Sequence, residues 1–136
     1  MATMKTASGI EEKSAPVDYD GLMQANLVRV FGERNADKRI RAIRELYAED
    51  AVLNEPDASA KGHVAINAAV TSLLASLPPA FVFRSMGPAI GHHNIGRLKW
   101  RSGPPDGPPV VTGMDIAHFD GNRIQSLFVF LEPRSA

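Results

Sequence analysis

The period of the hydrophobic pattern changes once along this chain, at the Pro78-Pro79 pair, and this change constrains the fold more than any motif. Before the pair, apolar residues recur every three or four positions, which is typical of amphipathic helices. After the pair, apolar and polar residues alternate, which predicts β-strands. Turn-forming segments such as GHHN and GPPDGPP separate these strands, so consecutive strands are expected to pair antiparallel. The four expected strands are residues 80–90, 95–102, 110–119 and 123–132.

Three helices are expected before the proline pair. The first is capped by Asp18 or Asp20, the second begins near Asp37, and the third covers residues 62–77. The second helix carries a basic cluster that is expected to face solvent, formed by Lys38, Arg39, Arg41 and Arg44. The apolar faces of the three helices are Leu22, Ala25, Val28 and Phe31; then Ile40, Ile43, Leu46 and Tyr47; then Ile66, Ala69, Val70, Leu73, Leu74 and Leu77.

These elements predict an α+β domain in which three helices pack against one face of a curved antiparallel sheet and leave a pocket at its open end. The 136 residues are enough for one domain, expected over residues 18–134 after a flexible tail at residues 1–17. Fifteen basic and fifteen acidic side chains balance, which argues against a nucleic-acid partner.

The composition also bears on compartment and cofactors. The chain has no cysteine, and no apolar stretch is long enough to span a bilayer, so a cytoplasmic protein with no membrane partner is expected. The segment GPPDGPP has prolines where a phosphate-binding loop needs backbone N–H groups, and it opens no helix. No nucleotide or other cofactor is therefore expected.

Asp115 needs an explanation, because it interrupts an otherwise apolar strand. A buried ionised carboxylate without a partner is costly, so Asp115 must be paired, protonated or facing a wet cavity. One alternative is an ion pair with Arg97 or Arg101 on the neighbouring strand. The other places Asp115 in the pocket, because strand alternation puts Gly113, Asp115 and Ala117 on one face, where small residues leave room.

Other polar residues are candidates for the same pocket. Glu55 ends the short strand AVLNEP before a turn expected at residues 57–61, and it faces either the pocket or solvent beside Asn54. His92 and His93 lie in an expected turn, where neighbouring side chains diverge, and no HxH or HxxxH spacing occurs. We therefore expect no metal site, and His93 is the better candidate for the pocket rim.

Alternation also constrains the last strands. Arg97 and Trp100 are three residues apart on one strand, so they cannot both face the pocket. Trp100 is expected in the core, at a dimer interface or at the pocket rim, and Arg97 in a surface ion pair or facing an epoxide or carboxylate ligand. Phe128 and Phe130 point to one face of the final strand and Val129 to the other. A strand that is apolar on both faces is covered on both sides, which predicts a homodimer through the sheet.

Three segments, LYAEDAVLNEP, GHHNIGRLKWRSG and VTGMDIAHFDGNRI, resemble the SnoaL-like proteins of the NTF2-like superfamily. The resemblance covers residues 22–132 and implies a cone-shaped α+β barrel, a homodimer and an apolar pocket between helices and sheet. Asp115 matches the general acid/base of the SnoaL-like polyketide cyclases. Glu55 and Asp115 match the two carboxylates of the ketosteroid isomerases. The isomerases' tyrosine has no counterpart on the expected first helix, so steroid isomerisation by that mechanism is not expected.

The main hypothesis is a small-molecule-binding protein that acts as an isomerase- or cyclase-type proton-transfer enzyme, without metal, on a small apolar carbonyl compound. One alternative is a non-catalytic module that binds a ligand or a partner. Another is an epoxide-hydrolase-like enzyme that uses Asp115 with Arg97. The candidate catalytic residues are Asp115, Glu55 and His93. The candidate ligand-binding residues are Arg97, Trp100, Asn54, His92 and Phe31.

Overall fold

The computed structural model describes residues 16–132, so the predicted tail lies outside the described residues except for Pro16 and Val17. The helices are α1 (Tyr19–Asn26), α2 (Ala36–Leu46) and α3 (His63–Ala75), and a π-helical turn, η2 (Leu27–Phe31), continues α1. The strands are β1 (Tyr47–Glu55), β2 (Ala58–Lys61), β3 (Val82–Ser85), β4 (Ile90–His92), β5 (Ile95–Gly103), β6 (Val111–Asp120) and β7 (Arg123–Leu131). None of the helices in this described part has the length and apolar character needed to cross a bilayer.

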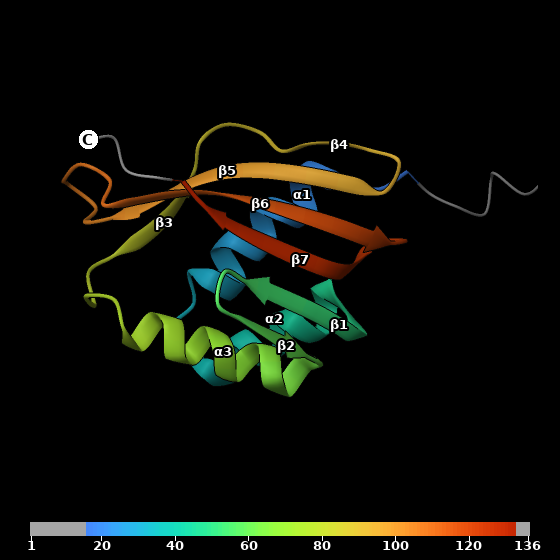
Figure 1. The fold of residues 1–136 in the computed structure, drawn as a ribbon, viewed down its shortest axis with the longest axis horizontal. Helices are drawn as coiled ribbons and strands as arrows, with labels where there is room; N and C mark the ends of the chain where they lie inside the picture. The colour runs from blue at the N-terminus through green and yellow to red at the C-terminus, as the bar shows by residue number, and fades with distance from the viewer. Residues whose placement is uncertain (1–15, 133–136) are drawn as a thin grey trace, which may run out of the picture.

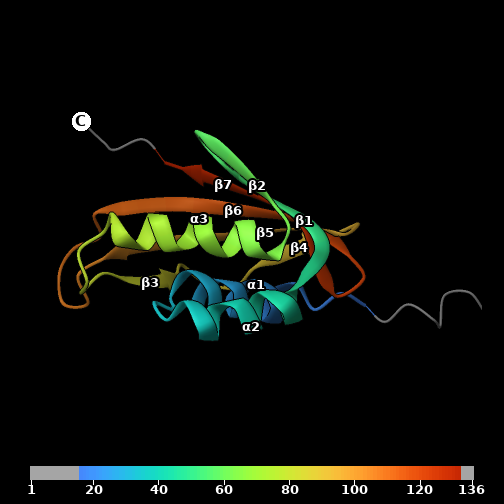
Figure 2. The ribbon, with the colours of Figure 1, turned by 90° about the horizontal axis from the view of Figure 1, so that it is seen from below.

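The strands form one sheet in the order β2-β1-β7-β6-β5-β3, and β4 also pairs with β5. Figures 1 and 2 show this sheet curving over the helices, which lie on one of its faces. The predicted α+β fold is therefore confirmed. The pairing is antiparallel except between β1 and β7, which are parallel. Sequence alternation gives no signal for that pair, because it joins segments far apart in the chain.

Two short segments differ from expectation. Residues 80–90, expected as one strand, form β3 and β4 separately, because Gly87 (φ 101°) and Pro88 interrupt the extended run. Residues 57–61, expected as a turn, contain β2, which pairs antiparallel with β1 at the edge of the sheet. Pairing with a neighbouring strand, which the local sequence does not reveal, decides the structure of the second segment.

The first helix begins at the expected cap and then departs from α-helical geometry. The Asp18 side chain accepts a hydrogen bond from the Gly21 backbone N–H at 3.0 Å. Further on, the π-helical turn η2 places successive side chains differently around the axis than an α-helix does. Val28, expected on the apolar face, is 60% exposed, whereas Val30 and Phe31 are buried. The prediction for Val28 is wrong because the buried stripe runs through Met23, Leu27 and Val30, at ordinary helical spacing, and Val28 lies outside it.

Arg39, expected on a solvated helix face, is only 1% exposed. Its guanidinium donates to Asn67 Oδ1 at 2.9 Å, to Thr71 Oγ1 at 2.6 Å and to the Glu33 carbonyl at 2.9 Å. The bonds to Asn67 and Thr71 join α2 to α3. The prediction is wrong for this member of the basic cluster, because polar groups on α3 supply the acceptors that a buried arginine requires.

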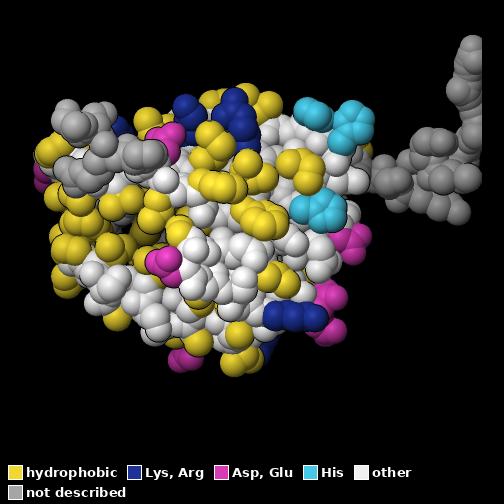
Figure 3. All heavy atoms as spheres, viewed as in Figure 1, with side chains coloured by type: hydrophobic (Ala, Val, Ile, Leu, Met, Phe, Trp, Pro, Cys, Tyr) yellow, Lys and Arg dark blue, Asp and Glu magenta, His cyan; other side chains and the backbone are white. Residues whose placement is uncertain are grey.

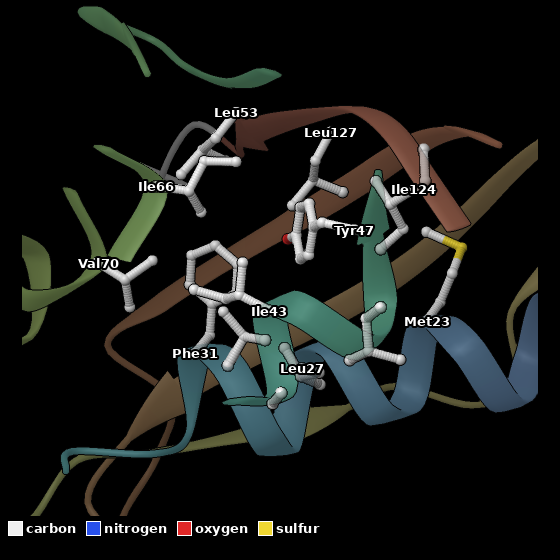
Figure 4. Packing of buried hydrophobic residues seen from close by; sticks show 14 of the residues in the cluster. Met23, Leu27, Phe31, Ile43, Tyr47, Leu53, Ile66, Val70, Ile124 and Leu127 are labelled. Atoms are coloured by element: carbon white, nitrogen blue, oxygen red, sulfur yellow. The ribbon is translucent and has the colours of Figure 1, made fainter. Parts of the chain in front are cut away.

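The hydrophobic core fills the space between the helices and the inner face of the sheet. Tyr47, expected on the second helix, is instead the first residue of β1 and is fully buried. Figure 4 shows its ring pointing into the core between Leu127 and Ile43. The Tyr47 hydroxyl donates to Asn26 Oδ1 at 2.6 Å, which satisfies both buried polar groups.

Candidate functional site

A cavity of about 190 Å³ lies between the helices and the inner face of the sheet. Figure 3 shows hydrophobic side chains gathered around a hollow at the left of the molecule, where Figure 1 places the C-terminal end of α3 and the end of β7. The walls are almost entirely apolar and include Leu27, Phe31, Leu73, Phe83, Val111 and Val129. Four of the lining residues have side chains with polar groups, namely Glu55, Trp100, Ser102 and Asp115.

Asp115 lies on the inner face of β6 and is 3% exposed. Its cross-strand neighbours, Leu98 on β5 and Val129 on β7, are both apolar. Among the described residues, its carboxyl receives one hydrogen bond, from Trp100 Nε1 to Oδ1 at 2.9 Å. Burial raises the pKa of Asp115 to about 7, although the Trp100 hydrogen bond lowers it. Asp115 therefore populates both protonation states near neutral pH, and its Oδ2 can meet a ligand.

The Trp100 indole reaches Asp115 because Gly113 has no side chain. Trp100 and Gly113 are cross-strand partners on β5 and β6, and Asp115 is two residues further along the same face. A Cβ at Gly113 would collide with Trp100 Cζ2 and would lie 2.7 Å from the Phe130 carbonyl oxygen. Strand alternation suggested that Gly113 would leave open space in the pocket. Instead, the Trp100 indole covers Gly113 and donates its N–H to the Asp115 carboxyl.

Glu55 lines the same cavity from the end of β1 and is half-buried. Burial raises its pKa above the ordinary value. The parallel register pairs Asn54 with Phe128, which places Glu55 beside Val129, the cross-strand partner of Asp115. Two strand spacings, roughly 10 Å, therefore separate Glu55 and Asp115 across Val129. The cavity holds two carboxyls, one deep and one near the edge of the sheet.

Within residues 16–132, the single ion pair is Arg29–Glu45 on the surface, at 2.9 Å. The alternative in which Arg97 or Arg101 pairs with Asp115 is therefore wrong, because the β5 arginines alternate with Trp100 and point to the outer face. In the same part of the chain, no group of three His, Asp or Glu side chains lies close enough to hold a metal ion.

The histidines lie away from the cavity. His93 and Asn94 have φ values of 51° and 67°, which makes them the two central residues of a tight hairpin turn between β4 and β5. The turn carries His92 and His93 into solvent, where their Nδ1 atoms are 2.8 Å apart. Neither histidine lines the cavity. The structure thus does not bring His93 to the rim, because the hairpin lies at the start of β5, whereas Trp100 and Ser102 line the cavity near the end of that strand.

Two ligand-binding candidates also lie elsewhere. Arg97 is exposed on the outer face of β5, opposite Trp100, as expected from their spacing. Asn54 accepts a hydrogen bond from Ser59 Oγ at 2.8 Å within the β1–β2 hairpin. Of the candidates from the sequence, the cavity therefore brings together Asp115, Glu55, Trp100 and Phe31.

Two residues, one that lines the cavity and one near the carboxyl, were not predicted from the sequence. Ser102 lines the cavity, and its position two residues after Trp100 on an alternating strand could have indicated this. Tyr47 lies close enough to Asp115 for their charges to interact. Burial raises the pKa of Tyr47 well above 10, the Asp115 charge raises it further, and the Asn26 hydrogen bond lowers it. Tyr47 therefore lies near the Asp115 carboxyl, although no tyrosine was expected there from the first helix. It belongs to β1 and does not line the cavity.

No protein-family model matches this chain, and no curated protein sequence matches it. Solved structures do. A proposed isomerase of the SnoaL-like family from Agrobacterium tumefaciens is 25% identical, with a TM-score of 0.77 over 85% of this chain and 97% of the other.

Two further structures share the fold at lower identity. A proposed polyketide cyclase from Sinorhizobium meliloti is 17% identical, with a TM-score of 0.63 over 80% of this chain and 93% of its own. A protein with a ketosteroid isomerase-like fold from Catenulispora acidiphila, solved with trimethylamine, is 14% identical, with a TM-score of 0.63 over 80% and 83%. The chain therefore has the NTF2-like, SnoaL-like fold that its sequence resembles.

Proposed function

We propose that this protein, which has a SnoaL-like fold, binds a small apolar carbonyl compound in the cavity and moves a proton on it. The observation that carries the proposal is Asp115, a buried carboxyl with a pKa of about 7 in an apolar cavity. Carboxyls with such pKa values are suited to general acid/base catalysis at neutral pH. The similarity to isomerases and cyclases supports the same kind of chemistry.

Asp115 and Glu55 line the same cavity, where one can act as the acid and the other as the base of such a reaction. Neutral Asp115 donates the Oδ2 proton to the carbonyl oxygen, while ionised Glu55 takes a proton from the adjacent carbon, and an enol forms. When Glu55 returns the proton to a different carbon of a conjugated enol and Asp115 regains its own proton, the carbonyl re-forms with the double bond shifted, so the overall change is an isomerisation. Their separation of roughly 10 Å between backbones leaves room for both side chains and a carbonyl group between them. Glu55 is partly exposed and can exchange its proton with solvent.

A binding role without catalysis is the second candidate, and one observation favours it. The walls are apolar, and a protein donor, Trp100 Nε1, already occupies one oxygen of Asp115. In that case the carboxyl serves only to orient a ligand. The epoxide-hydrolase alternative is not carried forward, because Arg97 lies on the outer face of the sheet.

Exchange of α-hydrogens on cyclohexanone in deuterated water tests the proposal without knowledge of the natural substrate. We expect the wild type to accelerate deuterium uptake, measured by mass spectrometry, and both Asp115→Asn and Glu55→Gln to lose most of this acceleration. His93→Ala is the matched control and keeps it, since His93 lies outside the cavity. Cyclohexanone that binds without exchange would establish the binding role. Equal exchange by wild type and Asp115→Asn would contradict the proposal.

We also propose that the outer face of the sheet pairs with a second copy of the chain. Phe128 and Phe130 on β7 are 41% and 53% exposed, and their cross-strand partners on β6 are Ile116 and Met114. This apolar row is a typical interface composition. Light scattering after size-exclusion chromatography should give a dimer for the wild type and a monomer for Phe130→Glu. The control Val64→Glu, on the exposed side of α3, should stay dimeric.

A further inference from the structure

Ser102 is the one buried side chain in the described part of the chain whose polar atom has no hydrogen-bond partner. It is 3% exposed and lines the same cavity as Asp115. A hydroxyl removed from water without a partner costs free energy, and alanine would fit the same strand position without that cost. The Oγ atom itself is almost inaccessible to solvent, so a ligand group would complete it after rotation about the Ser102 Cα–Cβ bond turns the hydroxyl into the cavity.

The register of the sheet places Ser102 at the other end of the cavity from Asp115. Ser102 pairs with Val111, and Asp115 is four residues further along β6. Four residues of extended strand span about 13 Å. Trp100 lies between them on the same face, two residues from Ser102, with its indole directed to Asp115. The apolar cavity thus has one hydrogen-bonding group near each end.

We propose that the ligand is an elongated compound of about one ring and a short chain, with a carbonyl at Asp115 and a second polar group hydrogen-bonded to Ser102 Oγ. The size follows from the volume, since a cavity of about 150 Å³ holds benzene and this one is somewhat larger, at about 190 Å³. Ser102 both donates and accepts, so the distal group is a hydroxyl or a carbonyl. This inference rests on the proposed function in taking the cavity as the ligand site.

Two probes that differ in one group test the distal contact. They are 4-(3-hydroxypropyl)cyclohexanone and 4-butylcyclohexanone, in which a terminal hydroxyl replaces a methyl group of similar size. Dissociation constants are measured by calorimetry with the full chain. We expect the wild type to bind the hydroxylated probe at least about fivefold more tightly than the butyl probe, because the distal hydroxyl pairs with Ser102.

Substitutions then assign the preference to Ser102. Ser102→Ala should abolish or reverse the preference, and Ser102→Thr, which keeps a hydroxyl, should retain part of it. Ser126→Ala, on the outer face of β7, is the matched control and should bind as the wild type does. Ser102→Ala should stay folded, with a melting temperature equal to or above that of the wild type, since it removes an unpaired hydroxyl.

Three results would overturn the inference: equal binding of both probes by the wild type, a preference that survives in Ser102→Ala, or no binding of either probe. Failure of the proposed function is distinguishable from these. It would show as Asp115→Asn leaving both dissociation constants and the exchange of cyclohexanone hydrogens unchanged, whatever the effect of Ser102→Ala.

Discussion

Trp100 donates its indole N–H to Oδ1 of Asp115 at 2.9 Å, at the wall of a cavity lined mostly by apolar side chains. The bond holds the carboxyl in one orientation and leaves Oδ2 without a hydrogen bond from the described residues. The bond also stabilises the ionised form of Asp115 and so lowers its pKa, but burial has the larger effect and raises it. The pair therefore combines an oriented acid with a pKa of about 7, the two properties that a proton-transfer residue needs at neutral pH.

The stability of the protein should fall as the pH rises from 4 to 7. The folded-state pKa of Asp115, about 7, lies above its ordinary value of 3.8, so ionisation in this range favours the unfolded chain. The loss should be on the order of 4 kcal/mol and complete above pH 8. Urea unfolding at several pH values should show this loss in the wild type but not in Asp115→Asn. Asp120→Asn, at an exposed position, is the control and should lose stability with pH as the wild type does. The expectation would be contradicted if the stability of Asp115→Asn fell with pH as much as that of the wild type.

Gly113→Ala should disturb the site without changing any polar group. The added methyl would collide with the Trp100 ring, so the indole must move and its bond to Asp115 is lost. We expect a loss of about 1–3 kcal/mol in the free energy of unfolding and a red-shifted fluorescence maximum from this single tryptophan. Gly107→Ala is the control, because its Cβ would meet only Pro104 carbons at 3.4 Å or more. An unshifted spectrum for Gly113→Ala would contradict the described packing.

Trp100→Phe should raise the pKa of Asp115 above 7. The substitution keeps an aromatic ring in the cavity wall but removes the donor that stabilises the ionised carboxyl. A hydrogen bond to a charged group contributes about 1.5–3 kcal/mol, which corresponds to a rise in pKa of about 1 to 2. The carboxyl carbon resonance of Asp115, followed by NMR against pH, measures the change. A pKa equal to or below that of the wild type would show that the indole does not stabilise the charge.

Arg39→Ala should destabilise the protein by about 2–4 kcal/mol, because it leaves Asn67 and Thr71 without their buried donor. Arg41→Ala, two residues away on the exposed side of α2, should cost less than about 0.5 kcal/mol. Urea unfolding at pH 7 compares the two variants. Equal costs would mean that the bonds between α2 and α3 contribute no more than a surface side chain.

The fold was predictable because the hydrophobic period specifies where helices end and strands begin, and Pro78-Pro79 marks the change. The errors have different causes. The first helix offers two apolar stripes, and the structure buries Met23, Leu27 and Val30 and leaves Val28 exposed. Arg39 is buried because α3 presents acceptors to it, which the sequence of α2 does not reveal.

The candidate site was predictable in part. Alternation along β6 indicates which face Asp115 shares, but it does not say what covers the neighbouring glycine. The residue that covers Gly113 is decided by the pairing of Trp100 with Gly113. This register between β5 and β6 cannot be predicted from the sequence, because a long loop joins the two strands. The unpaired hydroxyl of Ser102 is likewise a property of packing. The prediction of His93 at the pocket rim was wrong, because the sequence of a turn does not show toward which part of the molecule the hairpin points.

The indole N–H resonance of Trp100, followed by NMR as a function of pH, tests most directly whether Asp115 is a buried acid poised near neutrality. Trp100 is the single tryptophan, so its resonance is unambiguous, and its hydrogen bond makes it sensitive to the charge on Asp115. We expect one transition with a midpoint near pH 7 that is absent in Asp115→Asn. A midpoint near pH 4, or a transition that persists in Asp115→Asn, would contradict the account.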